Sequence, residues 1–229
     1  MKTLITLLLS IIIVFPSLGQ GRTVDVGSFS ELSLGISGTV YLKQGSTQSV
    51  EIECDQDIFD KIEFEIRGDK LVIKKEGKWN WNDGWRRSEV DIYITMDEIE
   101  GVSVSGSGSI ESDGMLKTED VRLSVSGSGN MELDLNSDEM DLRISGSGSI
   151  RLNGEANEAE AKISGSGRVK AEDLTVKIFQ ASISGSGSCY ITATDEVSAN
   201  ISGSGSVYYA GNPDRVVSNS SGSGKVRKM

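Results

Sequence analysis

Seven near-identical copies of a Ser-Gly-Ser-Gly motif return at an almost constant interval, and this interval limits the chain to few architectures. The stretch ISGSGSI at residues 144–150 is one copy. The first glycines of the copies are Gly106, Gly127, Gly146, Gly165, Gly185, Gly203 and Gly222, so the steps are 21, 19, 19, 20, 18 and 19 residues. A flexible Gly-Ser linker needs no such period, whereas a stack of equivalent coils requires one. The sequence therefore predicts a repeat protein with one motif in each coil.

Within one period, apolar residues alternate with polar ones. In residues 121–140 the positions that share one parity are Val121, Leu123, Val125, Gly127, Gly129, Met131, Leu133 and Leu135. Alternation with a period of two is typical of β-strands. We expect both glycines to face the interior and the serines to face outward. The motif then forms a sharp corner, because glycine has no Cβ to block a bend or a close backbone approach.

Coils of this length, each pairing with its equivalent one turn away, describe a parallel β-solenoid. The predicted fold class is all-β, a parallel β-helix built as a single-stranded solenoid with SGSG corner repeats. A right-handed coil is favoured, because coil length varies and the six-residue repeat of left-handed solenoids is absent. The alternative is an antiparallel meander, which the long period disfavours.

The N-terminal segment has the features of a signal peptide. Lys2 precedes an apolar run from Leu4 to Phe15, and the small residues Ser17 and Gly19 match a cleavage site. We expect residues 1–19 to be removed on export, to the periplasm, the cell surface or the medium. No later segment reaches the roughly 20 apolar residues of a membrane-spanning helix, so none is expected in the mature chain.

The remaining chain is predicted to form one β-helix domain, from about residue 28 to residue 210, with the repeat coils in 101–229. Residues 24–100 alternate apolar and polar residues without the full motif, and GISGTVYL at 35–42 is a degenerate copy. We expect this part to add strands to the same sheets and to cover their N-terminal end. At the other end, Ser220 replaces the apolar residue before the motif, as expected of a polar capping coil.

Charge and composition exclude several classes of function. The net charge is −11, and clustered Lys and Arg of the kind that bind phosphates are lacking, so nucleic acid is not an expected partner. There is no histidine, and the two cysteines, Cys54 and Cys189, provide too few ligands for zinc and no Cys-His pair for catalysis. The cysteines either form one disulfide or remain buried free thiols. No cofactor is expected.

Two stretches carry a family resemblance. FSELSLGISGTVYLKQG at 29–45 and DIYITMDEIEGVSVSGSG at 91–108, followed by repeated ISGSG, resemble the head domain of auto-transporter adhesins known as the GIN domain, a family common in Bacteroidetes. The resemblance covers nearly all of the chain after the signal peptide. It implies an exported β-helical domain with an adhesin or polysaccharide-binding role, and it brings no catalytic residues.

The candidate ligand-binding segment is KWNWNDGWRR at 78–87, which holds all three tryptophans of the chain. Flat aromatic rings beside polar side chains suit sugars, which present apolar C–H faces together with hydroxyls. The candidate residues are Trp79, Trp81, Trp85, Asn80, Asn82 and Asp83. The alternative is that the indoles pack across a hairpin or over an edge of the solenoid.

The outward serines and the acidic corners are two further candidates. The serines form two columns, Ser105, Ser126, Ser145, Ser164, Ser184, Ser202 and Ser221, and Ser107, Ser128, Ser147, Ser166, Ser186, Ser204 and Ser223. These hydroxyls either meet a polysaccharide or an ordered water layer, or bond one another along the stack. The acidic residues are Glu119, Asp120, Asp138, Glu139, Glu172, Asp173, Asp195 and Glu196. Stacked carboxylates could hold Ca²⁺, but the ligand spacing of known calcium-binding repeats and loops is absent. We therefore expect these residues to form a solvated surface that keeps the protein soluble.

The predicted function is that of an exported, non-enzymatic β-solenoid that binds a polysaccharide or cell-surface glycan. One alternative is a structural envelope protein without a specific ligand. Another is a carbohydrate-active enzyme that uses paired carboxylates.

Overall fold

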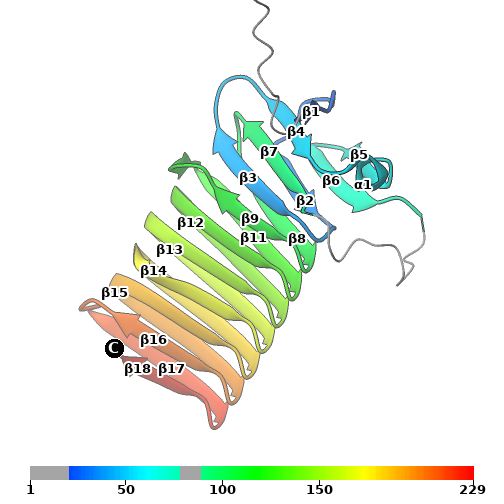
Figure 1. Ribbon diagram of the computed structural model, residues 1–229. Helices are drawn as coiled ribbons and strands as arrows, with labels where there is room; N and C mark the ends of the chain where they lie inside the picture. Colours follow the sequence, from blue (N-terminus) through cyan, green and yellow to red (C-terminus); the bar gives the residue numbers. More distant parts are fainter. Residues whose placement is uncertain (1–20, 78–88) are drawn as a thin grey trace, which may run out of the picture.

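The computed structural model describes residues 21–77 and 89–229, and nearly all of its regular structure is β-strand (Figure 1). The N-terminal elements are β1 (Arg22–Thr23), β2 (Glu31–Leu34), β3 (Thr39–Gln44), β4 (Ser49–Glu53), α1 (Gln56–Phe59), β5 (Ile62–Arg67), β6 (Lys70–Lys75) and β7 (Asp91–Met96). The repeat region contains β8 (Gly101–Gly106), β9 (Ser109–Ser112), β10 (Leu116–Lys117), β11 (Asp120–Gly127), β12 (Asn130–Gly146), β13 (Ser149–Gly165), β14 (Arg168–Gly185), β15 (Ser188–Gly203), β16 (Ser206–Ala210), β17 (Arg215–Gly222) and β18 (Lys225–Lys228).

Equivalent strands of successive coils pair in parallel. Gly127 of β11 is the partner of Gly146 in β12, and Gly146 is in turn the partner of Gly165 in β13. Side-chain hydrogen bonds follow the same register, since Asn153 donates to Asp134 over 2.7 Å, 19 residues earlier in the chain. The prediction of a parallel β-helix is therefore confirmed, with about 7 turns. Its handedness stays a prediction.

Each coil has two faces that meet at the glycine motif, and the motifs line one edge of the stack (Figure 1). One face consists of the strand segments that end at the motif, and the other, here called the return face, consists of the segments that begin after it. The interior between them is filled by Leu, Ile, Val and Ala from alternate positions, with Phe179 among the largest fully buried side chains. Because every second residue enters this core, the polar residues between them all face outward.

The two glycines of each motif differ, which corrects the expectation that both face the interior. The second glycine, such as Gly148, is buried, whereas the first, such as Gly146, is partly exposed. Gly146 has φ +121°, a conformation that side chains with a Cβ rarely adopt. A Cβ on either residue would also lie 2.5 Å from a backbone oxygen of the preceding coil, that of Gly127 or Gly129. Both positions thus require glycine, for partly different reasons.

Hydrogen bonding continues around the corner from coil to coil. The amide of Ser147 donates to the carbonyl of Gly127 over 2.8 Å, and the amide of Ser166 donates to Gly146 over 2.8 Å. The backbone of the motif is therefore part of the sheet ladder, and the prediction of a corner in place of a flexible linker is confirmed.

The N-terminal strands extend this stack and then cover its end. β2 and β3 flank the degenerate motif at 35–38 and pair in parallel with β8 and β9. β6 and β7 add a further parallel layer on β2 and β3. Antiparallel pairs complete the cover, with β4 on β7, β1 on β4, and β5 on β6. The end of the solenoid is thus closed by a change of strand direction.

Cys54 and Cys189 are both free thiols, which settles the open alternative in favour of unpaired cysteines. Cys189 is buried on the inward side of β15, and burial raises its pKa to about 12. Cys54 is only partly buried. Among residues 21–77 and 89–229, the structure has no helix of the length and apolarity that a bilayer span requires.

Candidate functional site

The tryptophan segment predicted to bind sugars, Trp79, Trp81 and Trp85 with Asn80, Asn82 and Asp83, lies outside the described residues. The strands on either side of it are described. Ile73 accepts a hydrogen bond from the amide of Gly35 over 2.7 Å, and Val90 accepts one from Thr39 over 2.9 Å. The chain therefore leaves and re-enters the described structure beside the degenerate corner at 35–38.

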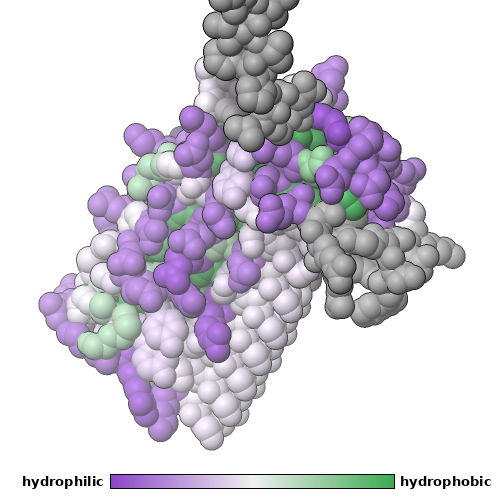
Figure 2. All heavy atoms as spheres, in the orientation of Figure 1, coloured by the Kyte–Doolittle hydropathy of each residue, from purple (hydrophilic) through white to green (hydrophobic). Residues whose placement is uncertain are grey.

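The two serine columns line the edge of the stack and face outward. All their members are exposed, and the region over the glycine corners forms a broad pale area of near-zero hydropathy in Figure 2. Within the described part of the chain, their hydroxyls bond no other protein group, except that of Ser107, which lies 2.9 Å from the hydroxyl of Ser37. Among the described residues, serines therefore bond one another along the stack where the degenerate motif meets the first full motif, and the serines of the seven full motifs do not bond one another. Their hydroxyls are available to water or to a ligand.

A shallow hollow of about 880 Å³ lies beside the first column, on the face that precedes the corner. Ser145, Ser164 and Ser184 line it, and Arg143 and Lys162 stand at the end of the hollow nearer the N-terminal coils. Next to the column run short side chains, Ser182, Asn200 and Asn219, and Asn219 donates to Asn200 over 3.1 Å. This hollow is uncharged toward the C-terminal coils and rich in hydroxyl and amide groups.

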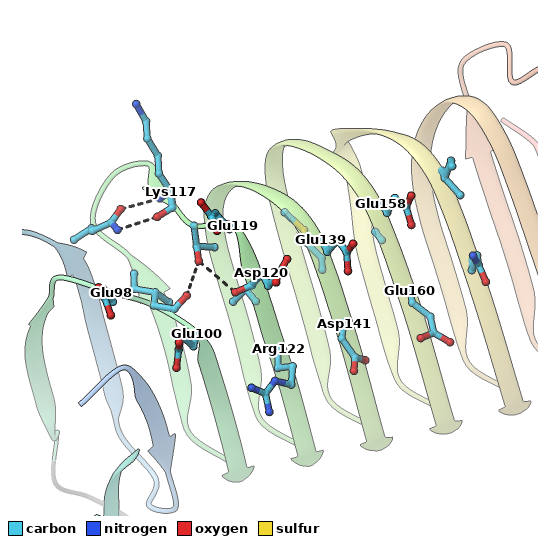
Figure 3. A pocket seen from close by; sticks show the side chains of 18 of the residues that line it. Glu98, Glu100, Lys117, Glu119, Asp120, Arg122, Glu139, Asp141, Glu158 and Glu160 are labelled. Atoms are coloured by element: carbon cyan, nitrogen blue, oxygen red, sulfur yellow. Dashed lines mark hydrogen bonds between the residues drawn. The ribbon is translucent and has the colours of Figure 1, made fainter. Parts of the chain in front are cut away.

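A second hollow, a groove of about 930 Å³, lies on the same face near the opposite corner and is strongly acidic (Figure 3). The carboxylates that line it are Asp97, Glu98, Glu100, Glu119, Asp120, Glu139, Asp141, Glu158 and Glu160. Successive coils supply equivalent positions, because Asp120 pairs in register with Glu139, and Glu139 with Glu158. At one end, the side chain of Gln44 donates to the carbonyl of Lys117 and accepts from its amide, both over 2.8 Å.

Cations neutralise only part of this acidic groove. Arg143 donates to Asp141, and Lys162 donates to Glu160 over 2.7 Å. Asp120, Glu139 and Glu158 have no cationic partner in the part of the chain that the structure describes. Among the described residues, no three acidic or cysteine side chains lie close enough together to hold a metal ion. The groove is a row of carboxylates spaced by the coil repeat.

The predicted acidic corners are brought together only in part. Glu119, Asp120 and Glu139 line the groove, whereas Asp138 lines a different hollow and Glu172, Asp173, Asp195 and Glu196 line neither. The sequence analysis missed Asp97, Glu98, Glu100, Asp141, Glu158 and Glu160. Their signal was present, since Asp141 and Glu160 occupy equivalent positions 19 residues apart, and the same interval separates Glu139 from Glu158.

Near the N-terminal end, Tyr41 and Tyr93 stack with ring centroids 5.2 Å apart, and Tyr93 is 41% exposed. Their register partners on either side are Glu111 and Glu51. The pKa of Tyr41 is raised, first by the charge of Asp91, then by burial and by the charge of Glu111. The pKa of Asp91 is itself raised, by burial and by the charge of Glu89. This aromatic pair therefore lies in a negative environment.

The chain matches a family model described as "putative auto-transporter adhesin, head GIN domain" over residues 28–213. A search of curated proteins finds no match.

Solved structures of three Bacteroidetes proteins share the fold. A "putative adhesin" from Bacteroides fragilis is 23% identical with a TM-score of 0.85, covering 93% of this chain and 98% of that chain. A "putative lipid binding protein" from Parabacteroides distasonis is 23% identical with a TM-score of 0.74 and the same coverage. A "putative adhesin" from Parabacteroides merdae is 24% identical with a TM-score of 0.70, covering 93% of this chain and 97% of that chain. At these identities the likeness shows the fold alone.

Proposed function

Because this chain belongs to the family of auto-transporter adhesin head domains, the GIN domain, we propose that it is an exported, non-enzymatic protein that binds a polysaccharide or another cell-surface glycan. Removal of residues 1–19 as a signal peptide is part of this proposal, as is one binding domain over the rest of the chain.

One observation carries the proposal, the exposed serine columns. Hydroxyls such as those of Ser145, Ser164 and Ser184 repeat from coil to coil, and no other described protein group bonds them. The repeat along the stack is about 4.8 Å, so the columns offer a regular array of donors and acceptors. A polysaccharide also presents hydroxyls at regular intervals, and many weak contacts along such a polymer add up to firm adhesion.

The tryptophan segment is a second contact surface in this proposal. Its flanking residues Ile73 and Val90 lie at the same edge of the stack as the serine columns. Trp79, Trp81 and Trp85 supply the indole faces of this surface in the proposal. Stacking of such a ring on a sugar is worth on the order of 2 kcal/mol, or about a thirtyfold difference in affinity.

The experiment is a binding screen of residues 20–229 against a glycan array and purified polysaccharides, followed by affinity measurements on variants. We expect S164Q/S184Q to bind at least tenfold more weakly, because long side chains break the flat column. Its matched control is T175Q/T194Q, which changes exposed threonines away from the column and should bind like the wild type. W81A should lose affinity and keep its melting temperature.

Three outcomes would count against the proposal or a part of it. Equal affinity of S164Q/S184Q and its control would exclude the serine columns as the binding surface. A lowered melting temperature of W81A with unchanged affinity would assign the indoles to packing. Absence of binding to every polysaccharide, or release of reducing ends from a bound one, would contradict a non-enzymatic glycan-binding role.

A further inference from the structure

The return face of the last four coils carries an unusual group of side chains at its outward positions. This cation–tyrosine surface consists of Arg168, Lys170, Ser188, Tyr190, Ser206, Tyr208, Lys225 and Arg227. The residues between them, Val169, Cys189 and Val207, are fully buried. Since alternate residues of a strand point to opposite sides, the named side chains all face outward.

Strand pairing arranges these side chains in two rows along the stack. One row runs from Lys170 through Tyr190 and Tyr208 to Arg227, and the other runs from Arg168 through two serines to Lys225. Three coil steps of about 4.8 Å separate the cations in each row, or about 14 Å, and the rows lie about 7 Å apart. Four cations thus mark the corners of a rectangle.

The two tyrosines between the cations form a rigid centre. Their ring centroids are 4.9 Å apart and their planes differ by 12°. Both rings lie on the outward side of their strands, in the row next to that of Ser188 and Ser206. Tyrosine offers contact area and hydrogen bonding at low cost in side-chain entropy.

The four cations are not neutralised by the protein. Within the described part of the chain, Arg168, Lys170, Lys225 and Arg227 have no carboxylate within ion-pair distance. By contrast, Arg151 of the preceding coil, the register partner of Lys170, has Glu132 at 3.6 Å. This grouping is notable in a chain with a net charge of −11. Like charges on adjacent strands repel, so an anionic ligand would relieve that repulsion.

We propose that the cation–tyrosine surface binds an acidic polysaccharide, with sugar carboxylates at the four cations and sugar hydroxyls at the tyrosines and serines. Guanidinium and ammonium groups are the usual partners of carboxylates. This inference rests on the proposed function, because it names the class of glycan. The surfaces are continuous, since Arg168 and Lys225 directly follow Gly167 and Gly224 at the ends of two motifs.

Charge density separates this ligand from nucleic acid. A DNA duplex carries a negative charge for about every 1.7 Å of its axis and needs a continuous basic track. Here the cations are spaced by two uncharged side chains, and the acidic groove repels a densely charged polymer. The other stacked tyrosine pair of the molecule, Tyr41 and Tyr93, differs from Tyr190 and Tyr208, because its register partners Glu51 and Glu111 are acidic. Only the C-terminal pair suits an anion.

The test compares two forms of one polymer. Residues 20–229 are titrated with polygalacturonate and with its fully methyl-esterified form, which has the same sugar backbone and no charge. We expect at least tenfold tighter binding of the charged form, with an affinity that falls as NaCl is raised. The variants are R168Q/K225Q and K170Q/R227Q, each of which should lose at least tenfold in affinity for polygalacturonate.

The matched control is K117Q/K177Q, which removes the same charge from two exposed lysines without ion pairs in the described structure. It should bind like the wild type. The comparison of the two polymers needs only the wild type, so it holds even if a variant folds poorly.

Equal binding of both polymers, or equal losses in the variants and the control, would overturn the charged site while leaving glycan binding intact. Tighter binding of duplex DNA than of polygalacturonate would overturn the class of ligand. If the wild type binds no polysaccharide at all, both this inference and the proposed function fail.

Discussion

Gly146 shows how a single residue type holds this fold together. Its φ of +121° belongs to the region that glycine tolerates, and a Cβ there would lie 2.5 Å from the carbonyl oxygen of Gly127. The next residue, Ser147, is exposed, and its amide donates to that same carbonyl. Backbone approach this close leaves no room for a side chain. In the motif, glycines that the backbone geometry requires therefore alternate with serines whose side chains the fold does not constrain.

Replacing Gly146 by Val is expected to destabilise the protein by about 3 kcal/mol, because strain at positive φ and overpacking act together. Ser147→Ala is expected to cost under about 1 kcal/mol, since it removes an exposed hydroxyl without a protein partner. Urea denaturation of the two variants beside the wild type measures both effects. Equal midpoints for the two would contradict the role assigned to the corner.

The hairpin of β5 and β6 covers the N-terminal end of the stack and is held at its surface by charge. Glu65 accepts hydrogen bonds from Arg67, over 2.7 Å, and from Lys74. These two hydrogen bonds, that of Arg67 first, lower the pKa of Glu65 to about 2. The Glu65 side chain is 34% exposed, so solvent weakens the contribution of these pairs to stability. Antiparallel pairing lets this element end the stack where a further parallel coil would leave an open edge.

We expect acid to remove this contribution. A carboxyl whose pKa is lower in the folded than in the unfolded state stabilises the fold above its unfolded pKa of about 4.3. That stability is lost as the pH falls through the folded value of about 2. The melting temperature of wild type should therefore exceed that of E65Q at pH 6, and the difference should disappear near pH 2. A difference that is the same at both pH values would exclude this ion-paired carboxylate as its source.

The molecule as a whole is a stack with two different ends. The first end is closed by the antiparallel strands. At the other end, β17 forms the last described layer of its face, and its residues at the inward positions are exposed. Ser218 and Ser220 stand there in register with the buried residues Ala199 and Ile201. Polar residues at these positions keep the open end of the solenoid from pairing with another copy.

Restoring the apolar residues should therefore promote association. We expect S218V/S220I to form a larger species than wild type at the same concentration in sedimentation velocity. The control N219V/S221I places similar residues on the outward side of the same strand. If both variants associate to the same degree, general surface hydrophobicity is the cause and the capping role is wrong.

Most of the architecture was determined by the sequence alone, because it depends on local and periodic information. Alternation with a period of two specifies strands and their buried sides, as at Leu123 and Val125. The near-constant step between motifs specifies parallel stacking in register, as between Gly127 and Gly146. Steric exclusion at the corner specifies glycine. The sugar-binding role of Trp79, Trp81 and Trp85 stays a prediction.

Only the tertiary structure decided which side chains meet across coils. Coil length varies, and the register shifts between Ala171 and Thr175 of β14, so positions beyond a corner cannot be aligned by counting. Stacking set the unpaired cations beside the C-terminal tyrosines. The carboxylates of Asp120, Glu139 and Glu158 follow a 19-residue step that is visible in the sequence, but only the structure showed that they line a groove. The positive φ of the first glycine in each motif and the antiparallel strands that cover the N-terminal end were also visible only in the tertiary structure. These features follow from contacts between residues far apart in the chain, which no local pattern encodes.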